Sequence, residues 1–187
     1  MITTTLRILL VEDSETDVVL IKRKIGKIVE NPQIEVVDNL DDCNYQLQNF
    51  VPDIILSDFN LPTCNGMDVL ELAKSVDPSV PFIFLTGTIN DEELAAHTIL
   101  AGASGYILKK HMDVLEEKLS PIFKKIVFNM VAKKDIREQI RKNKIAVNQI
   151  HNYLDSLKAD NAEQKDNIGK IRESIGKFKF GEDDHEI

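Results

Sequence analysis

The sequence predicts an α/β fold in which a parallel sheet carries helices on both faces. Short apolar runs, typical of strands that are covered on both sides, occur at residues 8–11, 54–56, 81–85 and 105–108. Segments with apolar residues at helical spacing alternate with these runs, and five such alternations in this length favour a parallel sheet. Each of the four runs stops at a residue that can take part in chemistry.

The order of the expected elements follows from turn and capping residues. We expect strands at residues 7–11, 34–37, 54–57, 81–86 and 105–108. Helices are expected to follow Ser14, Asp41, Gly66 and Asp91. The first helix has apolar residues as far as Ile28 and should stop at Asn31-Pro32, while the third should end before Pro78.

The ends of the apolar runs supply three acids, one hydroxyl and one lysine. These residues are Glu12, Asp13, Asp58, Thr86 and Lys109. The carboxyl ends of parallel strands meet at one edge of a sheet, where ligands bind in open α/β folds. Clustered carboxylates repel one another unless a cation lies between them, and hard oxygen ligands suit Mg²⁺. Asp58 is then a candidate nucleophile, with Thr86 and Lys109 holding phosphoryl oxygens.

Each of these residues also has a simpler interpretation. Asp58 alone could be a loop acid that caps the following helix, and Glu12 and Asp13 could be solvated acids near a helix N-terminus. Thr86 could be an ordinary threonine at a strand end. The combination of all five at matching strand ends favours the functional interpretation.

Four segments together resemble the receiver domain of two-component response regulators. They are Leu9-Leu-Val-Glu-Asp-Ser14, Asp58-Phe-Asn-Leu-Pro-Thr-Cys-Asn-Gly66, Phe84-Leu-Thr-Gly87 and Ala101-Gly-Ala-Ser-Gly-Tyr-Ile-Leu-Lys109. The resemblance covers about residues 5–125 and agrees in order, spacing and placement at strand ends. It implies a flavodoxin-like, doubly wound sheet with strand order 2-1-3-4-5.

The resemblance also implies a role for each candidate residue. Asp58 would be the phosphoacceptor, and Thr86 and Lys109 would contact the phosphoryl group. The implied magnesium ligands are Glu12, Asp13, Asp58 and the backbone carbonyl of Asn60. Thr86 and Tyr106 would form the conformational switch, although a strand tyrosine can equally serve packing alone.

The segment after Lys109 departs from the family pattern. Most receivers have a proline directly after this lysine, whereas this chain has Lys110. Ser120-Pro121 then resembles an N-cap followed by proline at the first helical position. We therefore expect a helix to restart there, or the fifth helix to kink.

The C-terminal part carries a regular apolar stripe. One series recurs every seven residues and comprises Ile140, Val147, Leu154, Asn161, Ile168 and Ile175. Its companion series is Ile136, Asn143, Ile150, Leu157, Gln164, Ile171 and Phe178. This spacing predicts a coiled coil, and a polar residue such as Asn161 favours a two-stranded parallel pair. The alternative is a marginal helix, because Gly169 and Gly176 weaken its later part.

We therefore predict a receiver at residues 1–125, a helical coiled-coil extension at 126–180 and an acidic, disordered tail at 181–187. Residues 136–178 should form a parallel homodimer. A second folded output domain is not expected, because the extension has few apolar residues away from its stripe.

Composition excludes several other classes. The net charge of −8 and the absence of tryptophan argue against a surface that binds nucleic acid. Cys43 and Cys64 form neither a metal-binding spacing nor a disulfide framework. We see no signal peptide and no apolar stretch long enough to span a membrane, so we expect a soluble cytoplasmic protein.

The predicted function is that of a response regulator without a DNA-binding or enzymatic output domain. A histidine kinase or phosphotransfer protein would pass a phosphoryl group to Asp58 with Mg²⁺, and the signal would leave through protein contacts or coiled-coil dimerisation. One alternative is a phosphorelay intermediate that uses His151 on the helical extension. The other is an inert receiver that serves as a structural dimeriser.

Overall fold

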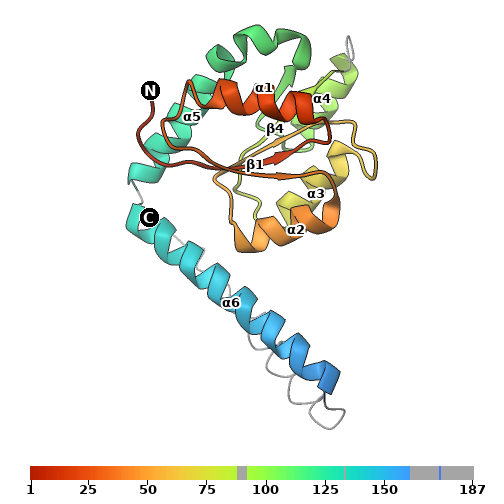
Figure 1. Cartoon of the computed structure of the whole chain (residues 1–187), viewed down its shortest axis with the longest axis vertical. Helices are drawn as coiled ribbons and strands as arrows, with labels where there is room; N and C mark the ends of the chain where they lie inside the picture. Colours follow the sequence, from red (N-terminus) through yellow and green to blue (C-terminus); the bar gives the residue numbers. More distant parts are fainter. Residues whose placement is uncertain (88–91, 133, 161–172, 174–187) are drawn as a thin grey trace, which may run out of the picture. The chain divides into compact units, whose positions relative to one another are not determined.

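The computed structural model describes residues 1–87, 92–132, 134–160 and 173. The chain divides into two compact units, Met1–Lys133 and Lys134–Ile187. The first unit is an α/β fold, and the second contains the helix α6 (Lys134–Asp160) (Figure 1).

A five-stranded sheet forms the centre of the first unit. Its strands are β1 (Arg7–Val11), β2 (Gln33–Val37), β3 (Ile54–Ser57), β4 (Phe82–Thr86) and β5 (Gly105–Leu108). The strand order is β2-β1-β3-β4-β5, and all neighbouring strands pair in parallel. The expected strand order and the doubly wound, flavodoxin-like architecture are confirmed.

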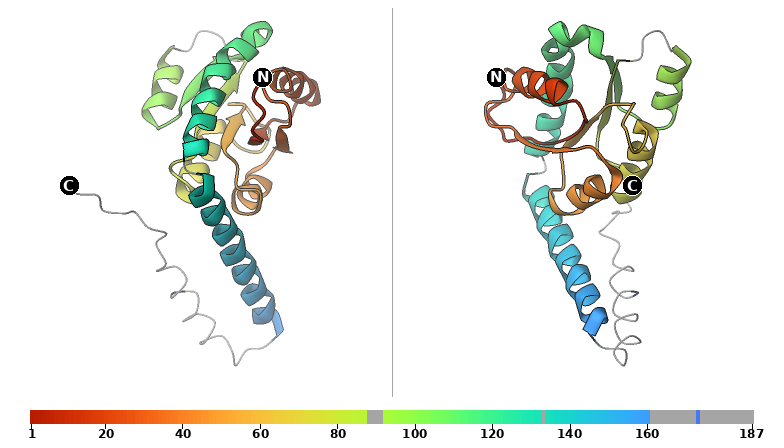
Figure 2. Two further views of the ribbon diagram at one scale, coloured as in Figure 1. Left: turned by 90° about the vertical axis from the view of Figure 1, so that its left-hand side faces the viewer. Right: turned by 45° about the vertical axis from the view of Figure 1, so that its right-hand side comes forward.

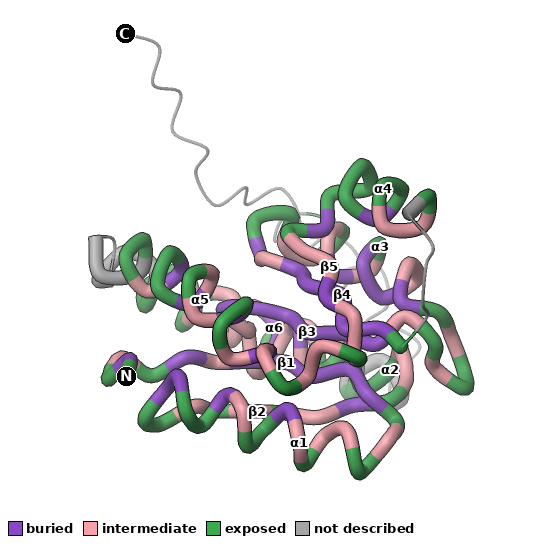
Figure 3. The backbone as a smooth tube through the Cα atoms, turned by 90° about the horizontal axis from the view of Figure 1, so that it is seen from above, coloured by how far each residue is buried: buried purple, intermediate pink, exposed green. Residues whose placement is uncertain are grey.

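Two hydrophobic clusters pack against opposite faces of this sheet. The flanking helices are α1 (Glu15–Ile25), α2 (Leu40–Asn49), α3 (Gly66–Val76), α4 (Glu92–Leu100) and α5 (Leu115–Ala132). One cluster joins the sheet to α1 and α5, and the other joins it to α2 and α3 (Figures 1 and 2). Buried residues follow the central strands, whereas α4 lies beside the β5 edge (Figure 3). Burial on both faces explains why β3 and β4 are continuous apolar runs.

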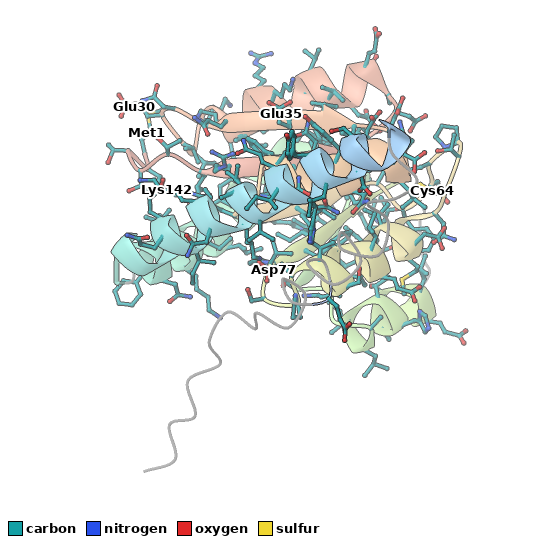
Figure 4. All side chains as sticks on the ribbon, turned by 90° about the horizontal axis from the view of Figure 1, so that it is seen from below. Met1, Glu30, Glu35, Cys64, Asp77 and Lys142 are labelled. Carbon is teal, nitrogen blue, oxygen red and sulfur yellow. The ribbon has the colours of Figure 1, made fainter. Side chains whose placement is uncertain are left out.

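Several helix boundaries differ from the predicted ones. The amide oxygen of Asn39 accepts a hydrogen bond from the Asp42 backbone N–H at 2.9 Å, so Asn39 caps α2 in place of Asp41. Helix α1 is capped by Ser14 as expected, but it ends at Ile25. The Ile2 N–H donates to the Ile28 carbonyl at 2.7 Å, and this pairing with the N-terminal segment directs the chain out of the helix. Met1 and Glu30 consequently lie close together (Figure 4).

The helix after β5 starts earlier than Ser120-Pro121. A 3₁₀ helix, η1 (Lys109–Val114), leads into α5, which continues through Pro121 to Ala132. A proline inside a helix removes one backbone hydrogen bond. Leu115, Leu119 and Phe123 are fully buried on both sides of the proline, and their packing on the sheet compensates for that loss. The predicted restart at Ser120-Pro121 is therefore wrong.

Helix α6 contains the first part of the predicted seam. Ile140 and Ile150 are 39% and 47% exposed, whereas Leu154 is 9% exposed. The later members of both series, from Asn161 onward, and the capping residue Asp91 fall outside the described residues. The coiled coil and the boundaries at residues 125 and 180 stay predictions. In the described part of the chain, no helix is long and apolar enough to cross a membrane.

Candidate functional site

The strand register brings the predicted site residues to one edge of the sheet. Val11 at the end of β1 is opposite Ser57 at the end of β3. Thr86 at the end of β4 is opposite Leu108 at the end of β5. Glu12, Asp58 and Lys109 each follow one of these ends directly, so three separate segments deliver their side chains to the same place.

Asp58 is held between backbone donors and a lysine. Its Oδ1 accepts hydrogen bonds from the backbone N–H groups of Phe59 at 2.6 Å and Asn60 at 3.3 Å. Its Oδ2 accepts one from Lys109 Nζ at 2.7 Å. Asp58 as a residue is 8% exposed, so its carboxylate is largely shielded from solvent.

The loop after Asp58 is fixed by a close backbone approach. The Gly66 N–H donates to the Phe59 carbonyl at 2.7 Å, and Asn60 and Asn65 form an isolated antiparallel bridge. A Cβ atom at Gly66 would lie 2.7 Å from the Asp58 carbonyl oxygen, so this position requires glycine. The role of the Asn60 carbonyl as a magnesium ligand stays a prediction.

The ammonium of Lys109 contacts three carboxylates at this edge of the sheet. Its Nζ lies 2.6 Å from Asp17 Oδ2, 2.7 Å from Asp58 Oδ2 and 2.8 Å from Glu12 Oε2. Burial by itself lowers the pKa of Lys109, but the contacts with Asp17, Asp58 and Glu12 outweigh it and raise the pKa above its ordinary value. The ammonium is therefore charged. It donates hydrogen bonds to Asp17 and Asp58 and forms an ion pair with Glu12.

Asp17 is the site residue that sequence reasoning missed. It lies in the first turn of α1, where acids are common because the helix dipole favours them. Its one local signal is its position three residues after the N-cap Ser14, at the edge where β1 ends. That position gives no indication of a contact with Lys109, which is 92 residues away.

Glu12, Asp13 and Asp58 form a group that fits a divalent cation. One oxygen from each lies within 4.8 Å of the others. Burial raises the pKa of Glu12, although Lys109 and the Ser14 N–H favour its charged form. The donors are all hard oxygens and carry more negative charge than Lys109 alone neutralises, which is the chemistry that Mg²⁺ prefers. The residues present therefore fit magnesium, with Asp13 on the exposed side.

A hollow of ≈ 480 Å³ borders this acidic group. Its walls include Glu12 and Asp13 together with Val18, Val36 and Asp38. A hollow of this size gives a small phosphorylated molecule or a side chain of a partner protein room to approach the carboxylates.

Thr86 lies on β4 and Tyr106 on β5, and their predicted roles in a conformational switch stay predictions. Thr86 is fully buried at the end of β4. Tyr106 is half-buried on β5 and packs against the cluster under α2 and α3.

The remaining candidates are not part of the site. Burial raises the pKa of Cys43 to about 12 and also raises that of Cys64, so neither thiol is activated. Cys64 lies in the loop between β3 and α3 (Figure 4). His151 belongs to α6, and its Nε2 atom is enclosed without a hydrogen-bond partner in the described part of the chain. The alternative in which His151 acts as a phosphorelay residue stays a prediction.

Comparison with known proteins agrees with this fold. The family model "Response regulator receiver domain" matches residues 8–120. The chain therefore belongs to the response regulator receiver family, a family of signalling modules in two-component systems.

Individual similar proteins cover different parts of the chain. The signal receiver domain of a protein described as a LuxO repressor from Vibrio parahaemolyticus is 26% identical, with a TM-score of 0.61, and the match covers 70% of this chain and 98% of that one. The phosphorylated cyanobacterial phytochrome response regulator RcpA is 27% identical, with a TM-score of 0.52, over 64% of this chain and 91% of that one. A protein-glutamate methylesterase/protein-glutamine glutaminase from Burkholderia thailandensis is 29% identical over 60% of this chain and 31% of its own length. The chain spans less than a third of the length of the curated relatives it matches.

Proposed function

We propose that this receiver accepts a phosphoryl group on Asp58 in the presence of Mg²⁺ and transmits the signal through protein contacts. The observation that carries the proposal is the contact between Lys109 Nζ and Asp58 Oδ2 at 2.7 Å, beside the acidic group of Glu12, Asp13 and Asp58. The proposed nucleophile Asp58, the ammonium of Lys109 and the acidic group proposed to bind magnesium thus lie at one sheet edge. The phosphodonor would be a histidine kinase or a phosphotransfer protein.

The chemistry of this chain's own residues follows from the hydrogen bonds at Asp58. The Phe59 and Asn60 N–H groups hold the carboxylate in one orientation, which lowers the entropic cost of an in-line attack. One Asp58 oxygen forms the new bond to phosphorus, and the bond from phosphorus to the donor's imidazole nitrogen breaks with its electron pair on that nitrogen. Lys109 and the Thr86 hydroxyl donate hydrogen bonds to phosphoryl oxygens. A magnesium ion held by Glu12, Asp13, Asp58 and the Asn60 carbonyl would neutralise further charge there.

The signal would leave through the surface formed by α4, β5 and α5. Phosphorylation would draw Thr86 toward the new charge and let Tyr106 rearrange, since both lie on strands that end at the site. Leu100 on α4 is 87% exposed and Phe128 on α5 is 75% exposed. These exposed apolar side chains could contact a partner protein whose affinity depends on the position of α4.

The test is phosphoryl transfer from acetyl phosphate. The wild-type chain with Mg²⁺ should gain one hydroxylamine-labile phosphoryl group, seen by intact mass or on a phosphate-affinity gel. Asp58→Asn should gain none, and Asp41→Asn, which removes an exposed acid at the start of α2, should behave like the wild type. Uptake by Asp58→Asn equal to the wild type would contradict the assignment. Failure of the wild type to bind either Mg²⁺ or beryllofluoride would favour an inert receiver that serves as a dimeriser.

We further propose that residues 136–178 associate as a parallel two-stranded coiled coil. The support is the seven-residue spacing of the seam together with the exposure of Ile140 and Ile150 on α6. Ile150→Asp should convert the dimer into a monomer in analytical ultracentrifugation. Asn152→Asp adds the same charge at an exposed position off the seam and should remain dimeric. A wild-type monomer, with and without beryllofluoride, would exclude this arrangement.

A further inference from the structure

Two sets of carboxylates overlap at the phosphoacceptor edge. Glu12, Asp13 and Asp58 form the group that suits a divalent cation, with oxygens within 4.8 Å of one another. Glu12, Asp17 and Asp58 form the group that holds Lys109, at 2.6 to 2.8 Å. Glu12 and Asp58 belong to both sets, whereas Asp13 belongs only to the first and Asp17 only to the second. Lys109 and a bound cation therefore share two acids.

This sharing creates a competition between two positive charges. A cation that takes oxygens of Glu12 and Asp58 weakens the hold of these acids on Lys109 and repels its ammonium. Lys109 has only 14% of its side chain exposed, so water compensates little of its charge. A lysine left without a carboxylate would either resist cation binding or move away from the phosphoacceptor.

The position of Asp17 allows it to hold Lys109 at the site without hindering cation binding. It makes the shortest of the three contacts with Lys109, at 2.6 Å, and it comes from α1, separate from the strand ends that supply the shared acids. Its backbone N–H is fixed by the Ser14 cap at 3.4 Å, so its carboxylate starts from an ordered first turn. The Asp17 side chain is 29% exposed, and the residue contributes no oxygen to the cation group.

We propose that Asp17 is a positioning residue that keeps Lys109 at the site while Mg²⁺ occupies Glu12 and Asp58. The proposal rests on the proposed function of Asp58. Asp17 retains its hydrogen bond to the ammonium when the contacts with Glu12 and Asp58 weaken, and it leaves two N–H donors for phosphoryl oxygens. It thereby permits cation binding and phosphoryl contact by Lys109 at the same time.

The test compares Asp17→Asn with Glu15→Gln in the full-length chain. Both substitutions remove one negative charge from the first turn of α1 and preserve side-chain shape, but no described hydrogen bond or ion pair joins Glu15 to Lys109. Mg²⁺ affinity is measured by titration calorimetry. The ordering of Lys109 is measured by the ¹⁵N signal of its ammonium group with Mg²⁺ and beryllofluoride, since this signal is visible only when solvent exchange is slow.

Asp17→Asn should weaken Mg²⁺ binding about tenfold, the worth of one hydrogen bond between charged groups. Glu15→Gln should change it less than about twofold, because an exposed charge is screened by solvent. The Lys109 ammonium signal should persist in the wild type and in Glu15→Gln and disappear in Asp17→Asn. Equal Mg²⁺ affinities for the two variants, or a Lys109 signal that persists in Asp17→Asn, would overturn the role of Asp17. A wild type that binds neither Mg²⁺ nor beryllofluoride would instead overturn the proposed function and this inference with it.

Discussion

Replacing Lys109 with methionine should destabilise the metal-free protein and increase the stabilisation that Mg²⁺ provides. Methionine retains much of the aliphatic stem of lysine but removes the ammonium that neutralises Glu12, Asp17 and Asp58. The side chains of Glu12 and Asp58 are only 1% and 11% exposed, so their mutual repulsion would be poorly screened.

The expected loss follows from the burial of these groups. Removing one partner of a buried ion pair costs about 3–5 kcal/mol. The Asp17 side chain is 29% exposed and recovers part of its hydration, so we expect the lower end, about 3 kcal/mol. For a unit the size of Met1–Lys133, this loss corresponds to a decrease in Tm of about 10 °C.

Magnesium should reverse much of this loss. A ligand at one hundred times its Kd stabilises the folded state by about 2.7 kcal/mol. In the variant, Glu12 and Asp58 no longer pair with an ammonium, so Mg²⁺ binds without a competing cation. The rise in Tm on adding Mg²⁺ should therefore be larger in Lys109→Met than in the wild type.

Differential scanning calorimetry with and without Mg²⁺ measures both effects. Lys110→Met is the matched control, because Lys110 is the exposed neighbour of Lys109 and should leave both Tm values unchanged. A metal-free Lys109→Met that melts at the wild-type temperature, or whose Tm rises no more with Mg²⁺ than that of the wild type, would show that Lys109 does not neutralise these acids.

Three further predictions concern the packing of the loop after Asp58 and of the two hydrophobic clusters. Gly66→Ala would place a Cβ atom 2.6 Å from Phe84 Cε1 and 2.7 Å from the Asp58 carbonyl oxygen. This overpacking should lower the free energy of unfolding by about 2 kcal/mol and slow phosphoryl uptake by Asp58. Unchanged Tm and uptake would contradict the close approach. Phe123→Ala should lower stability by about 3–5 kcal/mol in urea unfolding, because Phe123 on α5 is fully buried in the cluster against the sheet. A loss below about 1 kcal/mol would mean that α5 is not anchored there. Burial raises the pKa of Cys43 to about 12, so Cys43 should not react with a thiol reagent at about pH 8 until the protein unfolds. Modification of both Cys43 and Cys64 in the native chain would refute this prediction.

The sequence was sufficient to predict the sheet and which side chains meet at its edge, apart from Asp17. Buried parallel strands must be apolar on both faces, so residues 8–11, 54–56 and 81–85 were recognisable without any tertiary information. Parallel strands also bring their carboxyl ends to one edge, which placed Glu12, Asp58 and Lys109 together from their positions in the chain alone.

Local boundaries were less predictable, because tertiary contacts decide between competing signals. Asn39 and Asp41 are both good N-caps, and Asn39 caps α2 because its amide oxygen reaches the Asp42 N–H. Pro121 suggested a new helix start, but the burial of Leu119 and Phe123 on the sheet keeps α5 continuous. In each case the free-energy difference between the local alternatives is small compared with that of burying apolar side chains.

Only the tertiary structure revealed that Asp17 contacts Lys109. In the sequence, Asp17 is indistinguishable from any acid that stabilises the first turn of a helix. Its contact spans 92 residues and depends on how α1 packs on the sheet next to α5. The sequence therefore determines which groups stand at the strand ends, because strand periodicity and the parallel arrangement are local and topological rules. The packing of α1 against the sheet determines which acids share the lysine, because that requires side chains from distant segments to meet within hydrogen-bond distance.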